Sequence, residues 1–174
     1  GWRTRSDTAS AGQVRGMHSW IANNSDRWIA AGSYNKLYAY SGAGIQYDIT
    51  PTGFTAGNED ALTPVGYGNS FYGLEYYGTP RQESVTITPA TTWSMDSWGQ
   101  YLVACSSTDG KVYEWQLSTG TIAAVVANAP VNNRAILVTE ERFLMCLGAG
   151  GNPRLVQWSD REDNTVWTPA ATNE

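Results

Sequence analysis

The acidic side chains near the end of the sequence are the first candidates for chemistry. In the stretch WSDREDNTVWTP, Asp160, Glu162 and Asp163 surround Arg161. Clustered carboxylates could bind Ca²⁺ through oxygen ligands or, as a pair, hydrolyse a glycosidic bond. The spacing is not that of a calcium loop, no second carboxylate motif supports it, and Arg161 partly neutralises the charge. We interpret the cluster as a solvated loop at the edge of a sheet and expect no metal or other cofactor.

Other catalytic arrangements have little support in the sequence. A glycosidase would need carboxylates from distant parts of the chain to converge, and the candidates are Asp96, Glu114 and Asp160. His18, in GMHSW, is the only histidine. A zinc site around it lacks further ligands nearby in the sequence, and no GxSxG motif accompanies it as the elbow of a Ser-His-Asp triad. We expect His18 to be a partly buried strand residue, and no catalytic residues.

Composition and charge restrict the class of protein. The chain has 174 residues, 41% of them hydrophobic, with 18 glycines and an aromatic content of 12%. This composition favours many short strands joined by glycine turns. A net charge of −5 argues against a protein that grips nucleic-acid phosphates, because that work requires clustered Lys and Arg. No apolar run approaches the length of a membrane-spanning helix, so we expect no membrane span.

Three stretches of the sequence resemble one another. Each is an apolar run led by an aromatic residue, then a turn, then a second apolar run that ends in an aromatic residue. They are RWIAAGSYNKLYAY from Arg27, QYLVACSSTDGKVYEW from Gln100 and RFLMCLGAGGNPRLVQW from Arg142. The Gly, Asn, Asp and Pro of the turns predict three β-hairpins. GAGGNPR lacks the lysine and the helix that would follow a phosphate-binding loop.

A further strand precedes each hairpin. Trp20 precedes Trp28, and Trp93 precedes Tyr101, by the same eight positions, and we interpret the polar stretches between them, IANNSDR and SMDSWGQ, as turns. In the third unit, NNRAILVTEERFLM places an apolar strand and a TEER turn in the equivalent position. A fourth strand is expected downstream in each unit, at IQYDITP, IAAVVAN and TVWTP.

The middle strands have apolar residues at successive positions, and therefore on both faces. One face carries Trp28, Ala30, Tyr101, Val103, Phe143 and Met145, and the other carries Ile29, Ala31, Leu102, Ala104, Leu144 and Cys146. Such sheets are expected to be covered on both sides. Cys105 and Cys146 fall on opposite faces of corresponding strands, so we expect two small core residues and no disulfide.

Small antiparallel sheets that repeat and are covered on both sides are typical of β-propeller blades. The second and third repeats begin 42 residues apart, a typical blade period, and the first and second begin 73 apart. We therefore predict an all-β chain with about three propeller-like blades, at residues 1–56, 91–130 and 131–174, and an insertion at 57–90. Three blades do not close a ring, so we expect a longer propeller of which this chain is a part.

The insertion is the least ordinary stretch. Its aromatic residues alternate with glycines in GYGNSFYGLEYYGTPR, which combines rigid amphipathic rings with an adaptable backbone. Without a partner it would expose a large apolar area, so we interpret it as a contact surface; the alternative is an extra hairpin packed on its own blade. The candidate contact residues are Tyr67, Phe71, Tyr72, Tyr76, Tyr77 and Arg81.

Several of these stretches, taken in order, resemble a known family. GMHSW, RWIAAGSYNKLYAYS, DITPTGF, YGTPR, VYEWQLSTG and RLVQWSDREDNTVWTP are similar to the propeller-forming tail hub or packaged-DNA stabilisation proteins of tailed-phage virions. The resemblance extends over nearly the whole chain, although those proteins are several times longer. It implies a non-enzymatic role without cofactor, in which copies made in the host cytoplasm form a ring between the portal or adaptor and the tail fibre or needle proteins.

Two further expectations concern ligands. A negative lumen would repel DNA and let it pass, so DNA contact is expected to be at most unspecific. The alternative function is a carbohydrate- or receptor-binding propeller. That function requires Trp98, Trp158 or Trp167 to be exposed in a concave pocket, where the ring would stack on a sugar.

Overall fold

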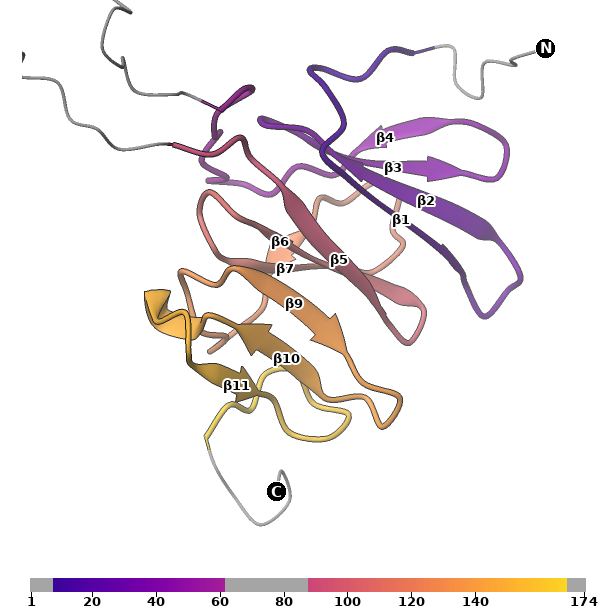
Figure 1. Cartoon of the computed structure of the whole chain (residues 1–174). Coiled ribbons are helices and arrows are strands. Elements are labelled where there is room, and N and C mark those ends of the chain that lie inside the picture. Colours follow the sequence, from indigo (N-terminus) through magenta and orange to yellow (C-terminus); the bar gives the residue numbers. More distant parts are fainter. Residues whose placement is uncertain (1–7, 62–87, 169–174) are drawn as a thin grey trace, which may run out of the picture.

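The chain folds into antiparallel β-sheets (Figure 1). The structure is a computed structural model and describes residues 8–61 and 88–168. Every regular element in these ranges is a strand, apart from one 3₁₀ turn, so the all-β prediction is confirmed. Within the same ranges, no helix has the length and apolar character needed to cross a membrane.

Three sheets follow one another in the described part of the chain, and in each sheet successive strands are neighbours. Sheet I consists of β1 (Gly16–Ile21), β2 (Arg27–Gly32), β3 (Leu37–Ser41) and β4 (Gln46–Asp48). Sheet II consists of β5 (Trp93–Trp98), β6 (Tyr101–Ser106), β7 (Val112–Trp115) and β8 (Ala124–Val125). Sheet III consists of β9 (Ala135–Val138), β10 (Leu144–Leu147) and β11 (Val156–Trp158), with the 3₁₀ turn η1 (Ala149–Gly151) between the last two.

The three predicted hairpins are present. β2 pairs with β3, β6 with β7 and β10 with β11, all antiparallel, and their turns coincide with SYNK, SSTDGK and GAGGNPR. Glycine is required in two of these turns, because Gly110 and Gly148 have φ angles of +61° and +69°, which other residues adopt only with strain. At Gly110 a Cβ would also lie 2.4 Å from Asn132 Cα.

The interpretation of SMDSWGQ as a turn is wrong. Most of it belongs to strand β5, and the turn is confined to Gly99 and Gln100. The polar residues are compatible with a strand because they bond to neighbouring sheets. Ser94 and Asp96 form hydrogen bonds with the backbone of β9, and Ser97 bonds to a side chain of β1.

Two of the three expected fourth strands are present, as β4 and β8. TVWTP forms no strand in the described part of the chain. Its residues are held as a loop instead, because the Trp167 indole nitrogen donates to the Asn164 carbonyl at 2.8 Å and the Asn128 side chain donates to the Thr165 carbonyl at 3.0 Å. These hydrogen bonds, one local and one from the distant Asn128, thus take the place of a fourth ladder.

The sheets pack face against face, and their first strands β1, β5 and β9 lie side by side (Figure 1). We call the face that sheets I and II turn toward the next sheet along the chain the leading face, and the opposite face the trailing face. On sheet III the trailing face is the one packed on sheet II, and the leading face is the opposite one. The leading face of sheet I packs on the trailing face of sheet II, and the leading face of sheet II packs on the trailing face of sheet III. Each contact has its own apolar core.

The first core is built around aromatic rings. Trp28 of sheet I meets Trp115 of sheet II edge to face, with ring centroids 5.2 Å apart, a favourable geometry for aromatic pairs. Burying one such large side chain stabilises the fold by roughly 1.5–3 kcal/mol. The main buried members are Trp20, Trp28, Ala30, Leu37, Ala39 and Ile49 from the first unit and Trp93, Leu102, Ala104, Tyr113, Trp115 and Ala123 from the second.

The second core is made of smaller side chains. Val103 and Cys105 of sheet II face Leu144 and Cys146 of sheet III, and all four are fully buried. The predicted role of the cysteines as core residues is confirmed, and both are free thiols. Cys105 lies on the leading face of sheet II and Cys146 on the trailing face of sheet III. Because these two faces pack together, both cysteines lie in the same core. Burial raises the pKa of each thiol to about 12.

The expectation that all sheets are covered on both sides is right only for sheet II. Among the described residues, sheets I and III each pack against another sheet on one face only. On the trailing face of sheet I, Met17 is 67% exposed, and on the leading face of sheet III, Val156 is 39% exposed.

Candidate functional site

The predicted acidic cluster forms a turn at the protein surface. The Asp160 side chain accepts a hydrogen bond from the Arg161 backbone nitrogen at 2.7 Å. One carboxylate oxygen of Asp163 accepts from both the backbone nitrogen and the hydroxyl of Thr165, at 2.9 and 2.6 Å. These two bonds hold the pKa of Asp163 below its ordinary value of 3.8. Glu162 is exposed and has a φ of +61°, so these side chains serve the turn.

Buried polar residues fix this turn to sheets II and III. The buried Ser159 hydroxyl accepts a hydrogen bond from the Leu144 backbone nitrogen at 3.0 Å. The Asn164 side-chain nitrogen donates to Glu114 on β7 of sheet II. Among the residues that the structure describes, no three His, Cys, Asp or Glu side chains are grouped so that they could hold a metal ion.

The carboxylates considered for glycoside hydrolysis do not converge. Asp96 and Glu114 lie on the leading face of sheet II, on either side of Val103, and two strand spacings separate them by roughly 10 Å. Glu114 accepts its hydrogen bond from Asn164, and Asp160 lies in the turn. Each carboxylate is engaged with a different segment, so the three do not form a common site.

A line of polar contacts joins sheets II and III along their first strands. The Ser94 hydroxyl donates to the Ile136 carbonyl at 2.9 Å and accepts from the Ile136 nitrogen at 3.1 Å. Asp96 Oδ2 accepts from the Val138 nitrogen at 2.8 Å. Among the described strands, β9 pairs with β10 on one side only. The bonds from Ser94 and Asp96 occupy backbone groups on its other side, which would otherwise lack a partner in the described part of the chain.

The only histidine occupies the corresponding place between sheets I and II. His18 Nε2 and Ser97 Oγ are joined by a hydrogen bond of 2.8 Å, and the imidazole stacks on Trp20 with ring centroids 5.9 Å apart. Burial lowers the pKa of His18 below 6.5, although the nearby Asp96 acts in the opposite direction. The Asp96 carboxylate bonds to the Ser97 and Val138 backbone nitrogens. Ser97, His18 and Asp96 have the residue types of a Ser-His-Asp triad, but the Asp96 carboxylate bonds to these backbone nitrogens. The arrangement is therefore a contact between sheets.

The Tyr- and Gly-rich contact residues lie outside the described residues: Tyr67, Phe71, Tyr72, Tyr76, Tyr77 and Arg81. The two ends of the insertion are described. The Gly57 nitrogen donates to the Tyr34 carbonyl at 2.8 Å, and the Thr91 nitrogen donates to the Asn58 carbonyl at 3.0 Å. The Arg15 guanidinium pairs with Asp60 at 2.9 Å. The insertion thus begins and ends at one place, between sheets I and II.

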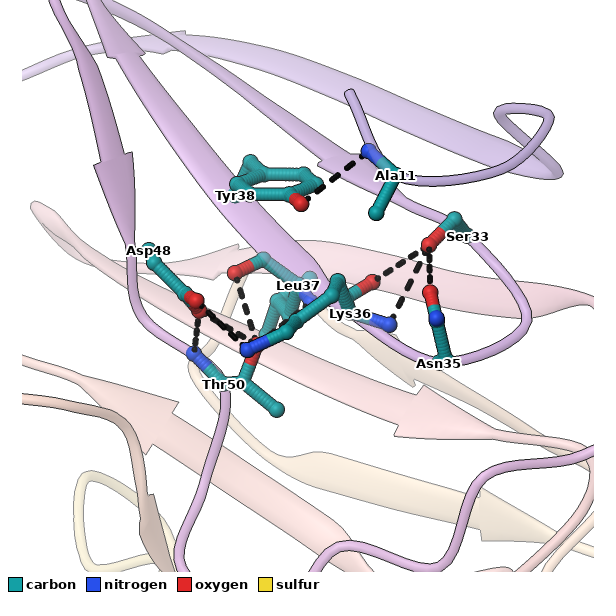
Figure 2. A network of polar contacts seen from close by, with 8 residues as sticks. All are labelled: Ala11, Ser33, Asn35, Lys36, Leu37, Tyr38, Asp48 and Thr50. Atoms are coloured by element: carbon teal, nitrogen blue, oxygen red, sulfur yellow. Dashed lines mark hydrogen bonds and ion pairs between the residues drawn. The ribbon is translucent and has the colours of Figure 1, made fainter. Parts of the chain in front are cut away.

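A polar network fixes the hairpin end of sheet I near that place (Figure 2). Ser33 Oγ donates to Asn35 Oδ1 at 3.0 Å and accepts from the Lys36 nitrogen at 3.1 Å, which closes the turn. Lys36 Nζ reaches Asp48 at 2.7 Å, and the Thr50 hydroxyl donates to the same carboxylate at 2.5 Å. The network connects the β2–β3 turn to the end of β4, so it holds the edge of the sheet.

The tryptophans proposed for carbohydrate binding differ in position. Trp98 is 5% exposed and belongs to the second core, so it is not available for stacking on a sugar. Trp158 is 44% exposed. Trp167 lines a cavity of about 520 Å³ together with the polar residues Asn128 and Gln157.

Sequence reasoning missed the contacts of Ser94, Asp96 and Ser97 because SMDSW resembles a turn in composition. Their alternation was the available signal: Ser94 and Asp96 point to one neighbouring sheet, while Ser97 points to the other. Ser94, Asp96 and Ser97 are thus used to join the sheets.

No protein-family model, no curated protein and no solved structure matches the chain.

Proposed function

We propose that the protein is a non-enzymatic structural component of a phage tail or connector, and that its three sheets are blades of a β-propeller. One observation carries the architecture: sheet II is enclosed between two similar sheets, and the first strands of all three lie side by side. Small up-and-down sheets stacked around an axis are the construction of a propeller. In this proposal, continued stacking of such sheets closes a ring.

The assignment to a virion depends on the order of motifs in the sequence, from GMHSW to WSDREDNTVWTP. In this proposal, copies of the protein form a ring that connects the portal or adaptor with the tail fibre or needle proteins. In the same proposal the insertion at residues 57–90, whose two described ends lie at one place, contacts a neighbour. The acidic net charge of −5 suits a lumen through which DNA passes without binding.

The use of the reactive side chains supports a structural role. Asp96, Glu114 and His18 have the residue types of catalytic groups. Asp96 and His18 each form a hydrogen bond to another sheet, and Glu114 accepts one from the loop after β11. Such bonds between sheets hold the relative orientation of rigid units, which a ring under mechanical stress requires. In this proposal the three side chains serve the contacts between sheets and have no catalytic role.

Imaging of native particles tests the proposal. Particles that contain this chain are purified without crosslinking and imaged by electron cryomicroscopy, and an antibody against the chain locates it. A symmetric ring at the tail or portal of a virus would support the proposal. An isolated protein that never copurifies with virions would overturn the virion assignment.

A carbohydrate-binding function is the second candidate, favoured by the cavity beside Trp167. The experiment is a titration of tryptophan fluorescence with a panel of oligosaccharides, in the unchanged chain and in Trp167→Ala. Val125→Ala is the control, because Val125 is an exposed residue (52%) outside that cavity. Saturable binding lost only in Trp167→Ala would establish this function, and absence of binding would exclude it for the sugars used.

A further inference from the structure

The trailing faces of sheets I and II have matching rows of side chains. In sheet I one row across the strands is Met17, Ala31 and Tyr38, and in sheet II the corresponding row is Met95, Ala104 and Tyr113. The next rows are Ser19, Ile29 and Tyr40, and Ser97, Leu102 and Trp115. At these positions the two faces have the same residue or one of similar shape, whereas on the fourth strands Asp48 of β4 occupies the place of Val125 of β8.

These matching faces differ in what covers them. On sheet II the face is buried against the leading face of sheet I, with Leu102 and Trp115 each 1% exposed. On sheet I, the Ala11 backbone nitrogen bonds to the Tyr38 hydroxyl at 3.1 Å and covers one end (Figure 2). Ala31 and Tyr38 are only 4% and 6% exposed, whereas Met17 is 67% exposed and Ser19 is also exposed. The open face of sheet I therefore has the side chains of a face that binds a leading face.

An open leading face is present at the other end of the stack. On sheet III it contains Leu137, Met145, Leu147 and Val156. The position of Val103 on sheet II corresponds to Met145 on sheet III, and that of Val112 corresponds to Val156. Val112 is 1% exposed in its core, whereas Val156 is 39% exposed. The two open faces are thus the two halves of the contact that is made twice inside the chain.

We propose that the trailing face of sheet I docks on the leading face of sheet III of a second copy of this chain, head to tail. The occupant follows from the internal contacts, because the same strand position faces the next sheet in both of them, Ala30 in sheet I and Val103 in sheet II. A self-complementary dimer would have to break that rule. A heterologous contact of this type closes into a ring when the rotation per copy permits and otherwise forms a filament.

The number of copies follows from blade number and rests on the proposed function, since it takes the sheets as propeller blades. Propellers typically have four to eight blades. The described residues of the 174-residue chain form three sheets, and the only multiple of three in that range is six. Two copies would close one propeller, with two identical junctions between them.

The experiment measures the mass of the 174-residue chain in solution by light scattering and native mass spectrometry. The unchanged chain is expected as a dimer. Met17→Glu and Val156→Lys each place a charge in both junctions of that dimer, and each is expected to raise its dissociation constant about 30-fold or more, the effect of losing a strong interface residue. Ile122→Glu is the matched control, because Ile122 is 45% exposed but lies on neither face.

Mixing the two charged variants distinguishes head-to-tail docking from other modes. A mixed dimer has one junction with both faces unchanged and one in which the introduced glutamate of one copy would meet the introduced lysine of the other. Dimers are therefore expected to reappear in the mixture of Met17→Glu with Val156→Lys. A self-complementary dimer would respond to only one variant and would not be rescued. A monomer of the unchanged chain at all concentrations would overturn the proposal.

The outcomes also separate this inference from the proposed function. A rescued dimer that never associates with virions would support the docking mode and contradict the virion role. A monomeric chain found in a tail ring would do the opposite.

Discussion

His18 on β1 and Ser97 on β5 are joined by a hydrogen bond of 2.8 Å that spans sheets I and II. The imidazole lies between the two sheets, against Trp20, and the charge of Asp96 acts on it. Because the sequence has only one histidine, the protonation of this contact can be followed without interference from another imidazole.

Acidification below neutral pH is expected to weaken the contact between sheets I and II. Burial makes the folded-state pKa of His18 lower than 6.5, so the unfolded chain binds the proton more readily. The histidine's contribution to the free energy of unfolding is complete above pH 6.5 and is lost as pH falls through 6.5 toward the folded-state pKa. Urea unfolding midpoints between about pH 7.5 and about pH 5 measure it. His18→Gln should remove this dependence, and an unchanged dependence in that variant would contradict the assignment.

Alanine at position 32 is expected to destabilise the first core. A Cβ at Gly32 would lie 2.4 Å from two ring atoms of Trp93, whose indole nitrogen donates to the buried Ser33 carbonyl at 2.7 Å. The ring cannot shift without losing that bond, so Gly32→Ala should cost about 1–3 kcal/mol. Thermal unfolding measures the loss. Gly120→Ala is the control, because a Cβ there meets nothing within 4 Å, and an equal loss in both variants would refute the packing argument.

Loss of the Asp96 carboxylate should loosen sheet III. In Asp96→Ala the Val138 backbone nitrogen loses its acceptor at 2.8 Å, and an unpaired partly buried donor costs about 1–3 kcal/mol. Hydrogen exchange at the Val138 amide is expected to accelerate together with this loss. Glu140→Ala, in the exposed turn after β9, is expected to change stability by less than about 0.5 kcal/mol. Unchanged exchange at Val138 would show that the bond contributes nothing.

The two cysteines are expected to be unreactive in the folded protein. Cys105 and Cys146 are fully buried, and burial raises the pKa of each thiol to about 12, so the nucleophilic thiolate is scarce at neutral pH. Iodoacetamide should modify neither residue in native buffer and both in urea, as measured by mass spectrometry. Rapid modification of either cysteine without denaturant would mean that the second core opens easily.

The hairpins could be predicted from the sequence because their causes are local. Glycine at 110 and 148 permits positive φ angles, and the short apolar runs on either side of these turns predict paired strands. The assignment of SMDSW failed for the opposite reason. Ser94 and Asp96 resemble turn residues, and only the proximity of β9, which lies much further along the chain, makes them suitable for a strand.

The sequence alone determined that the chain is all-β, where its three hairpins lie, and that both cysteines belong to a core, because side-chain alternation and turn chemistry act over a few residues. Only the tertiary structure decided which faces meet. The pairing of leading with trailing faces, the bond between His18 and Ser97, and the use of Asp96 and Glu114 between sheets all join residues far apart in sequence. No local pattern encodes such contacts, since they depend on how rigid sheets stack.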